Sequence, residues 1–232
     1  MLWSRKRLGF VAALGFWASA ATTSVPDEGR VDLALAIAID VSYSVDSTEH
    51  QLQMQGFGTA LQSVEVLDAI RKGKHQRIAV TVYQWSDEFN QIILVPWRIL
   101  ATEEDVKALG NELASGRRDA SEGGTAISAS LVFGSTLFNS APSSDRKVID
   151  LATDGRNNIG RPAHEARDFV VGQGITINGL AVSNEWKHLA GYLEKQVIGG
   201  NLSFVEEAQS YDDFGAAMLR KLVREIEGPG VT

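Results

Sequence analysis

The pattern of apolar and polar positions along the chain predicts a sheet with a fully buried central strand. Residues 33–39 (LALAIAI) are apolar at every position, which is typical of a parallel strand covered on both faces. Residues 77–85 alternate in polarity and are rich in β-branched side chains, and residues 92–97 follow after a short turn. So short a link predicts an antiparallel hairpin at the sheet edge, where Pro96 is tolerated because an edge strand can spare an N–H group.

The remaining periodicity predicts helices and strands in alternation. One amphipathic helix is predicted after Asp46, ending near residue 72 with basic residues in its last turn. The later predicted helices span residues 102–115, 126–138, 163–173, 186–197 and 211–226, and the later strands span residues 146–153, 175–182 and 203–206. We therefore expect an α/β fold: a doubly wound, mainly parallel sheet with one antiparallel edge strand and helices on both faces.

The amino terminus has the features of a secretory signal peptide. Residues 5–7 are basic, residues 8–18 are apolar, and small residues at positions 18 and 20 form a cleavage signal. The apolar segment is shorter than the ~20 residues that a membrane-spanning helix needs, so we expect cleavage and no membrane span afterwards. The expected divisions are a signal peptide (1–20), a linker (21–31), one domain (32–227) and a carboxyl-terminal tail (228–232). This organisation indicates a periplasmic or secreted protein.

Composition excludes several kinds of chemistry. The 232-residue chain has no cysteine and a formal net charge of −7, which becomes −10 when the signal peptide removes three basic residues. An exported protein without cysteine has no disulfide, no thiol nucleophile and no thiolate metal site. The acidic balance gives no indication of a nucleic-acid partner. The four histidines show no metal-ligand spacing, and we expect surface positions for all of them: His50, His75, His164 and His188.

Oxygen-bearing side chains follow the first predicted strand at alternate positions. Asp40, Ser42 and Ser44 cannot share one face of a helix, but they can converge in a turn that leaves a strand. One carboxylate and two hydroxyl groups suit a hard cation such as Mg²⁺. The same residue types also cap helices, so this stretch alone leaves a helix cap as the alternative. Asp46 could reach such a site, but we expect it to cap the following helix.

Two later stretches supply another hydroxyl and another carboxylate. Thr125 ends a polar, glycine-containing loop (residues 116–125), and Asp154 follows the strand predicted at residues 146–153. Because ligands of doubly wound sheets bind beyond the carboxyl ends of the strands, we expect both residues to lie near Asp40. Taken alone, Thr125 is better explained as the N-cap of the next helix, and only together with the other two stretches is a metal ligand the favoured interpretation.

The five oxygen donors resemble the metal-ion-dependent adhesion site (MIDAS) of von Willebrand factor A (vWA) domains, over about residues 33–226. The chain also resembles exported bacterial proteins of the DUF1194 type, which contain this domain and no other. The resemblance implies a vWA/Rossmann-like fold and a Mg²⁺ or Mn²⁺ ion. It also implies that a protein or envelope partner completes the ion's coordination with a carboxylate. The implied metal-site residues are Asp40, Ser42, Ser44, Thr125 and Asp154, with the three hydroxyl groups binding directly and the two carboxylates often acting through water.

An enzyme is the main alternative. An apolar strand that ends in Asp also occurs in Mg²⁺-dependent phosphatases with an aspartyl nucleophile. Those enzymes carry a second Asp two residues later, where this chain has Ser42, which could not serve as the acid for a leaving group. The sequence shows no Ser-His-Asp set and no phosphate-binding loop. We therefore expect a binding module and no enzyme, with a Mg²⁺-dependent hydrolase and a purely structural metal as the alternatives.

Overall fold

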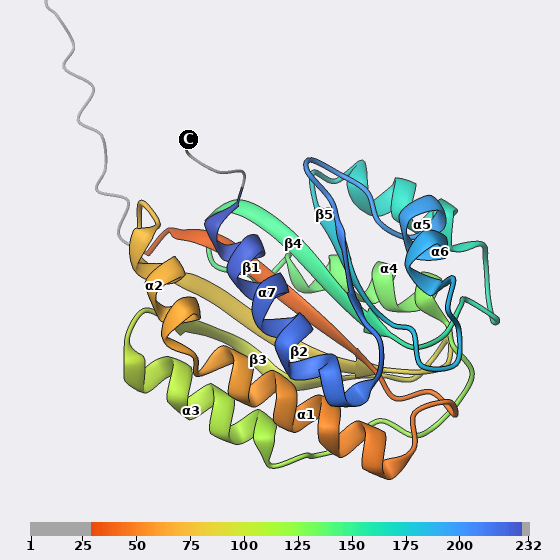
Figure 1. Ribbon diagram of the computed structural model, residues 1–232. Coiled ribbons are helices and arrows are strands. Elements are labelled where there is room, and N and C mark those ends of the chain that lie inside the picture. The colour runs from red at the N-terminus through yellow and green to blue at the C-terminus, as the bar shows by residue number, and fades with distance from the viewer. Residues whose placement is uncertain (1–28, 229–232) are drawn as a thin grey trace, which may run out of the picture.

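The computed structural model describes residues 29–228, so the predicted signal peptide, most of the predicted linker and all but the first residue of the predicted tail lie outside the described residues. Six strands form one sheet in the order β3-β2-β1-β4-β5-β6 (Figure 1). Strand β3 runs antiparallel to β2, and the other neighbouring strands are parallel, as predicted. The strands are β1 Val31–Asp40, β2 Ile78–Trp85, β3 Gln91–Leu100, β4 Ser144–Thr153, β5 Thr176–Val182 and β6 Val205–Ala208.

Seven α-helices cover the two faces of the sheet in the described part of the chain. They are α1 Ser47–Leu61, α2 Val64–Lys72, α3 Glu103–Ala114, α4 Ile127–Leu137, α5 Ala163–Val171, α6 Leu189–Gln196 and α7 Phe214–Glu227, the last preceded by a short 3₁₀ turn at Tyr211–Asp213. Helices α1, α3 and α7 lie on one face, and α4, α5 and α6 lie on the other (Figure 1). Within residues 29–228, no helix is long and apolar enough to cross a bilayer.

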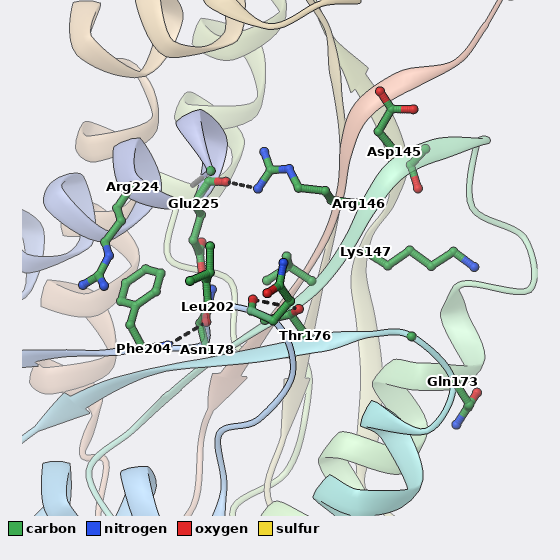
Figure 2. A pocket seen from close by; sticks show the side chains of 15 residues that line it. Asp145, Arg146, Lys147, Gln173, Thr176, Asn178, Leu202, Phe204, Arg224 and Glu225 are labelled. Atoms are coloured by element: carbon green, nitrogen blue, oxygen red, sulfur yellow. Dashed lines mark hydrogen bonds between the residues drawn. The ribbon is translucent and has the colours of Figure 1, made fainter. Parts of the chain in front are cut away.

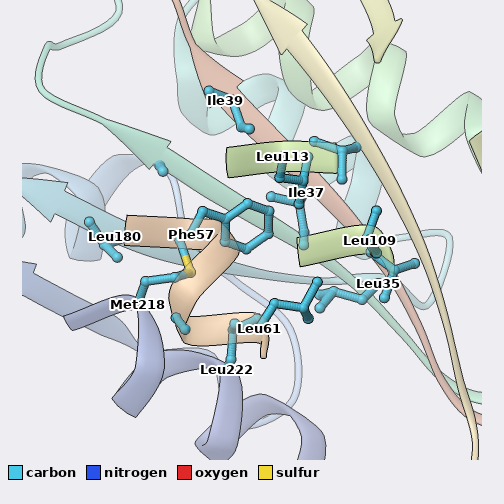
Figure 3. Packing of buried hydrophobic residues seen from close by; sticks show 14 of the residues in the cluster. Leu35, Ile37, Ile39, Phe57, Leu61, Leu109, Leu113, Leu180, Met218 and Leu222 are labelled. Carbon is cyan, nitrogen blue, oxygen red and sulfur yellow. The ribbon is translucent and has the colours of Figure 1, made fainter. Parts of the chain in front are cut away.

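Strand β1 explains why both faces can be covered. Its leucines and isoleucines at odd positions pack against α1, α3 and α7 (Figure 3), and its alanines at even positions pack against α4 and its neighbours. Every residue of β1 except Asp32 is buried, and each fully buried Leu or Ile contributes about 1.5–3 kcal/mol. The small alanines leave room for α4 to approach the sheet closely. The prediction of a central strand covered on both faces is therefore confirmed.

The prediction of a single helix after Asp46 is wrong, because the structure has two helices there. Helix α1 ends at Leu61, and the Ser63 hydroxyl accepts a hydrogen bond from the Val66 N–H (3.2 Å), which starts α2. This N-cap residue interrupts a helical spacing of apolar residues that continues from α1 into α2. The capping role of Asp46 is confirmed, since its carboxylate accepts from two N–H groups in the first turn of α1 (2.7 and 2.8 Å).

The surface position expected for His50 is also wrong. His50 is only 3% exposed, and its Nε2 donates to the carbonyl oxygen of Arg117 (3.2 Å). Helix α1 turns this residue toward residues 116–125, a tertiary contact that its polar neighbours in the sequence do not indicate.

Candidate metal-binding site

Four of the five predicted donors meet where β1 and β4 end. The two strands are neighbours in register, with Ile39 opposite Ala152, so Asp40 and Asp154 leave the same edge of the sheet. The Ser44 hydroxyl donates to the Asp154 carboxylate (2.6 Å) and lies 3.2 Å from the Ser42 hydroxyl oxygen. Residues that are 110 positions apart in the chain are therefore joined directly.

Asp40 is held in place by protein donors on both of its carboxylate oxygens. The Ser42 N–H donates to one oxygen (2.8 Å), and the Thr153 hydroxyl donates to the other (2.5 Å). Asp40 is fully buried, so its carboxylate has a fixed position. Thr153 was not predicted as part of the site, although it directly precedes Asp154 in the sequence.

The fifth predicted donor, Thr125, packs beside the other four without a hydrogen bond to them. A methyl group added to Gly155 would lie 3.3 Å from the Thr125 hydroxyl oxygen, so Thr125 touches the loop that carries Asp154. The Thr125 N–H donates to the Asn158 side chain (2.8 Å), and the Asn158 N–H donates back to the Thr125 carbonyl (3.0 Å). The N-cap position of α4 is Ala126, without any side-chain cap. The alternative that Thr125 caps this helix is therefore wrong.

The loop of residues 116–125 is anchored to the loop that carries Ser42. The Arg118 guanidinium donates to the carbonyl oxygens of Val41 (2.9 Å) and Val45 (3.1 Å). From the neighbouring strand, the Gln84 side chain accepts from the Asp119 N–H (2.7 Å). Neither contact could be predicted from the sequence, because Arg118 lies in a segment with the composition of an exposed loop and Gln84 in one with the pattern of an ordinary strand.

Tyr211 is a further residue that the sequence did not indicate. Its hydroxyl donates to the second carboxylate oxygen of Asp154 (3.1 Å), from a position 57 residues away in the chain. This contact joins the start of α7 to the site.

The two carboxylates of the site are not paired with any basic side chain in the described part of the chain. Burial and the neighbouring Asp154 raise the pKa of Asp40 to about 7, and burial also raises the pKa of Asp154. Among residues 29–228, no hydrogen bond or ion pair joins either carboxylate to a lysine, arginine or histidine. Two carboxylates and three hydroxyl groups without a cation fit a hard divalent ion, for which oxygen ligands are the preferred set.

A second group of potential ligands lies at the opposite end of β1. Single ligand atoms of Asp32, His75 and Asp145 lie within 4.8 Å of one another. Both carboxylates already have protein partners: Asp32 accepts from the His75 N–H (2.9 Å), and Asp145 pairs with Arg30 (2.5 Å) and with the His75 ring (3.0 Å). These contacts join β1, β4 and the loop before β2, so they have a structural role without any ion.

A cavity of about 600 Å³ lies near the amino-terminal ends of β4 and β5, away from the predicted site (Figure 2). Arg146 lines it and donates to the carbonyl oxygens of Glu225 (2.7 Å) and Ile226 (2.6 Å), which satisfies the end of α7. The Glu225 side chain, also in the lining, belongs to a buried charge cluster in which Lys221 pairs with Asp150 and with Glu225 (2.5 Å). The apolar run of β4 tolerates Asp150 because of this lysine.

The comparisons with solved structures identify the fold as that of a vWA domain. Proximal thread matrix protein 1 from the mussel byssus is 18% identical (TM-score 0.63), with 85% of this chain and 48% of that chain covered. A von Willebrand factor type A protein from Catenulispora acidiphila is 20% identical (TM-score 0.58; 85% and 42% covered). The vWF domain of the type V pilus tip protein Mfa5 from Porphyromonas gingivalis is 12% identical (TM-score 0.56; 87% and 98% covered). The chain thus spans about half the length, or less, of the first two proteins.

The family follows from the sequence itself. No curated protein sequence matches the chain. The profile described as "Protein of unknown function (DUF1194)" matches residues 30–230, and the chain belongs to this family.

Proposed function

We propose that the chain is an exported, metal-dependent binding module that recognises a partner through a Mg²⁺ or Mn²⁺ ion. The ion would be held by Asp40, Ser42, Ser44, Thr125 and Asp154. The observation that carries the proposal is that two buried carboxylates and two hydroxyl groups meet at one sheet edge, with the Thr125 hydroxyl against the Asp154 loop and no basic side chain paired to either carboxylate among residues 29–228. The residues present fit a hard divalent cation, which would supply a positive charge with open coordination positions.

The chemistry of the donors suits recognition. Hydroxyl ligands are neutral, and both carboxylates already accept protein hydrogen bonds, Asp40 from Thr153 and Asp154 from Tyr211. If the hydroxyl groups bind directly and the carboxylates act through water, the ion has no anionic direct ligand from this chain, so a carboxylate presented by a protein or envelope partner would complete its coordination. Ser42 stands where a phosphatase of the aspartyl type needs a second acid, so we propose binding without catalysis.

Several neighbours in fold support this proposal. A second structure of the mussel byssus protein (TM-score 0.58, 17% identity) is described as having a zinc-occupied MIDAS motif. The pilus adhesin SpaC from Lactobacillus rhamnosus GG has the same fold (TM-score 0.57, 13% identity). These descriptions belong to those proteins, and the shared fold supports the proposal of a metal-dependent binding role here.

Thr125 allows the first test of the proposal. Thr125→Ala is expected to weaken Mg²⁺ binding and Mg²⁺-dependent capture of the partner from envelope extract, with little change in melting temperature. Thr102→Ala is the matched control, because the Thr102 hydroxyl does cap a helix, accepting from the Asp105 N–H (3.2 Å). It should cost ~0.5–2 kcal/mol of stability and leave Mg²⁺ binding unchanged. If Thr125→Ala behaves like Thr102→Ala, Thr125 is not a metal ligand.

Export provides the second test. From the basic start, the short apolar segment and the small residues at positions 18 and 20, we expect a mature chain that begins at Ala21 in the periplasm or outside the cell. Amino-terminal sequencing of the protein from the native envelope measures this directly. Intact Met1 in a washed membrane fraction would show that residues 8–18 act as an anchor.

A further inference from the structure

A groove of about 380 Å³ lies between helices α4 and α5 and the turn that joins β2 to β3 (residues 86–90). Three phenylalanines contribute to its apolar lining, one on each wall: Phe89 on the turn, Phe133 on α4 and Phe169 on α5. Two smaller apolar residues of α4, Ala129 and Val132, complete it. Phe89 is 97% exposed and Phe169 is 58% exposed. Phe133 is fixed by an edge-to-face contact with Tyr83 (ring centroids 5.3 Å apart). Apolar side chains exposed around a hollow are characteristic of an interaction site.

The groove and the candidate metal site share their supporting loops. Ser86 starts the turn that carries Phe89, and its carbonyl oxygen accepts a hydrogen bond from the Ala126 N–H (2.8 Å). Ala126 directly follows Thr125 in the chain. On the other side, Asn157 accepts from the N–H of Ser128 (3.0 Å), which lines the groove, and the adjacent Asn158 holds Thr125. The groove therefore begins within a few residues of the proposed ion and leads away from it over α4.

Two arginines lie beside the groove and the proposed metal site. Arg161 lines the groove, and Arg156 lies 3.3 Å over the Trp186 ring, beside the Asp154 loop. No ion pair joins either arginine to a carboxylate within the described residues. Glu88 also lines the groove, and Glu185 lies near enough to Asp154 to raise the pKa of that carboxyl, so the charge around the two sites is mixed. Within this setting, the two arginines are the groups that can pair with an acidic residue of the partner.

We propose that the groove receives a large apolar side chain of the partner whose carboxylate completes the metal ion. This inference rests on the proposed function and makes it more specific. The partner is a protein segment in which an acidic residue lies near a phenylalanine or a residue of similar size. An acidic polysaccharide could supply the carboxylate, but it has no group that would fill a hollow lined by three phenylalanines.

The test uses short fluorescent peptides of glycine and serine that carry one glutamate, with or without one phenylalanine at varied spacing. Fluorescence polarisation in Mg²⁺ and in chelator gives the affinity of each peptide. At one or more spacings, the phenylalanine should tighten Mg²⁺-dependent binding by about tenfold or more. Phe89→Ala and Phe169→Ala should remove this gain and leave the glutamate-only peptide unaffected. Leu202→Ala is the matched control, because Leu202 is 60% exposed and lines the cavity near the amino-terminal ends of β4 and β5.

The possible outcomes separate the two proposals. If Mg²⁺ binds and phenylalanine adds nothing at any spacing, the groove proposal is overturned and the metal site stands. If phenylalanine peptides bind equally in Mg²⁺ and in chelator, the groove does not act together with the ion, which also overturns the proposal as stated. If the protein binds no Mg²⁺ in calorimetry, the proposed function itself fails.

Discussion

Lys221→Met is expected to lower the free energy of unfolding by about 3–5 kcal/mol, because removal of one partner leaves uncompensated buried charge. The Lys221 ammonium lies between Asp150 and Glu225, and all three side chains are 0% exposed. Burial and Asp150 raise the pKa of Glu225 to about 8, so the folded state holds this proton at pH values where the unfolded chain releases it. The contribution of Glu225 to stability therefore falls as pH rises from the ordinary glutamate range toward 8. Denaturant unfolding at several pH values measures both effects.

The controls for Lys221 separate the buried cluster from ordinary surface pairs. Lys72→Met removes an exposed pair with Glu227 (2.8 Å) and should leave stability unchanged. Adding Asp150→Asn and Glu225→Gln to Lys221→Met should restore much of the lost stability, since the buried charges are then gone. If Lys221→Met lowers the free energy of unfolding no more than Lys72→Met does, the pairing of Lys221 on α7 with Asp150 on β4 does not stabilise the fold.

Asp40→Asn and Asp154→Asn are expected to weaken Mg²⁺ binding by about 10–100-fold, the range typical of groups that act on a metal through other ligands or water. Asparagine keeps the shape of each side chain but removes the negative charge at the site. Asp46→Asn is the matched control, because Asp46 follows the same loop and caps α1, with its side-chain hydrogen bonds confined to residues 46–49. Calorimetric titration of the metal-free protein measures the change. Unchanged affinity in both site variants would contradict the proposed assignment.

The alternation of elements could be predicted from the sequence because burial leaves a pattern in the strands: β1 is apolar at nearly every position, and the second half of β4, which is buried, is apolar apart from Asp150 and Thr153. The cap at Asp46 was also predictable, since a capping box is local. The break between α1 and α2 was not predicted. Its only local signal is the N-cap residue Ser63, whereas the helical spacing of apolar residues continues on both sides of it. Boundaries fixed by single hydrogen bonds are less visible in a sequence than faces fixed by burial.

The candidate site could be predicted as a set of donors but not as an arrangement. Asp40, Ser42 and Ser44 lie within one turn, and strand order explains why Asp154 lies beside them. The contacts of Tyr211 with Asp154 and of Arg118 with the Ser42 loop depend on how α7 and residues 116–125 pack. Such contacts leave no local pattern, because any polar residue of suitable length at those positions looks like ordinary surface.

The most direct test of the central claim is anomalous diffraction from crystals of the protein grown with Mn²⁺. The proposal predicts one strong peak at the carboxyl ends of β1 and β4, among Asp40, Ser42, Ser44, Thr125 and Asp154. A peak confined to Asp32, His75 and Asp145 at the opposite end of the sheet, or no peak with the protein saturated in Mn²⁺, would contradict it.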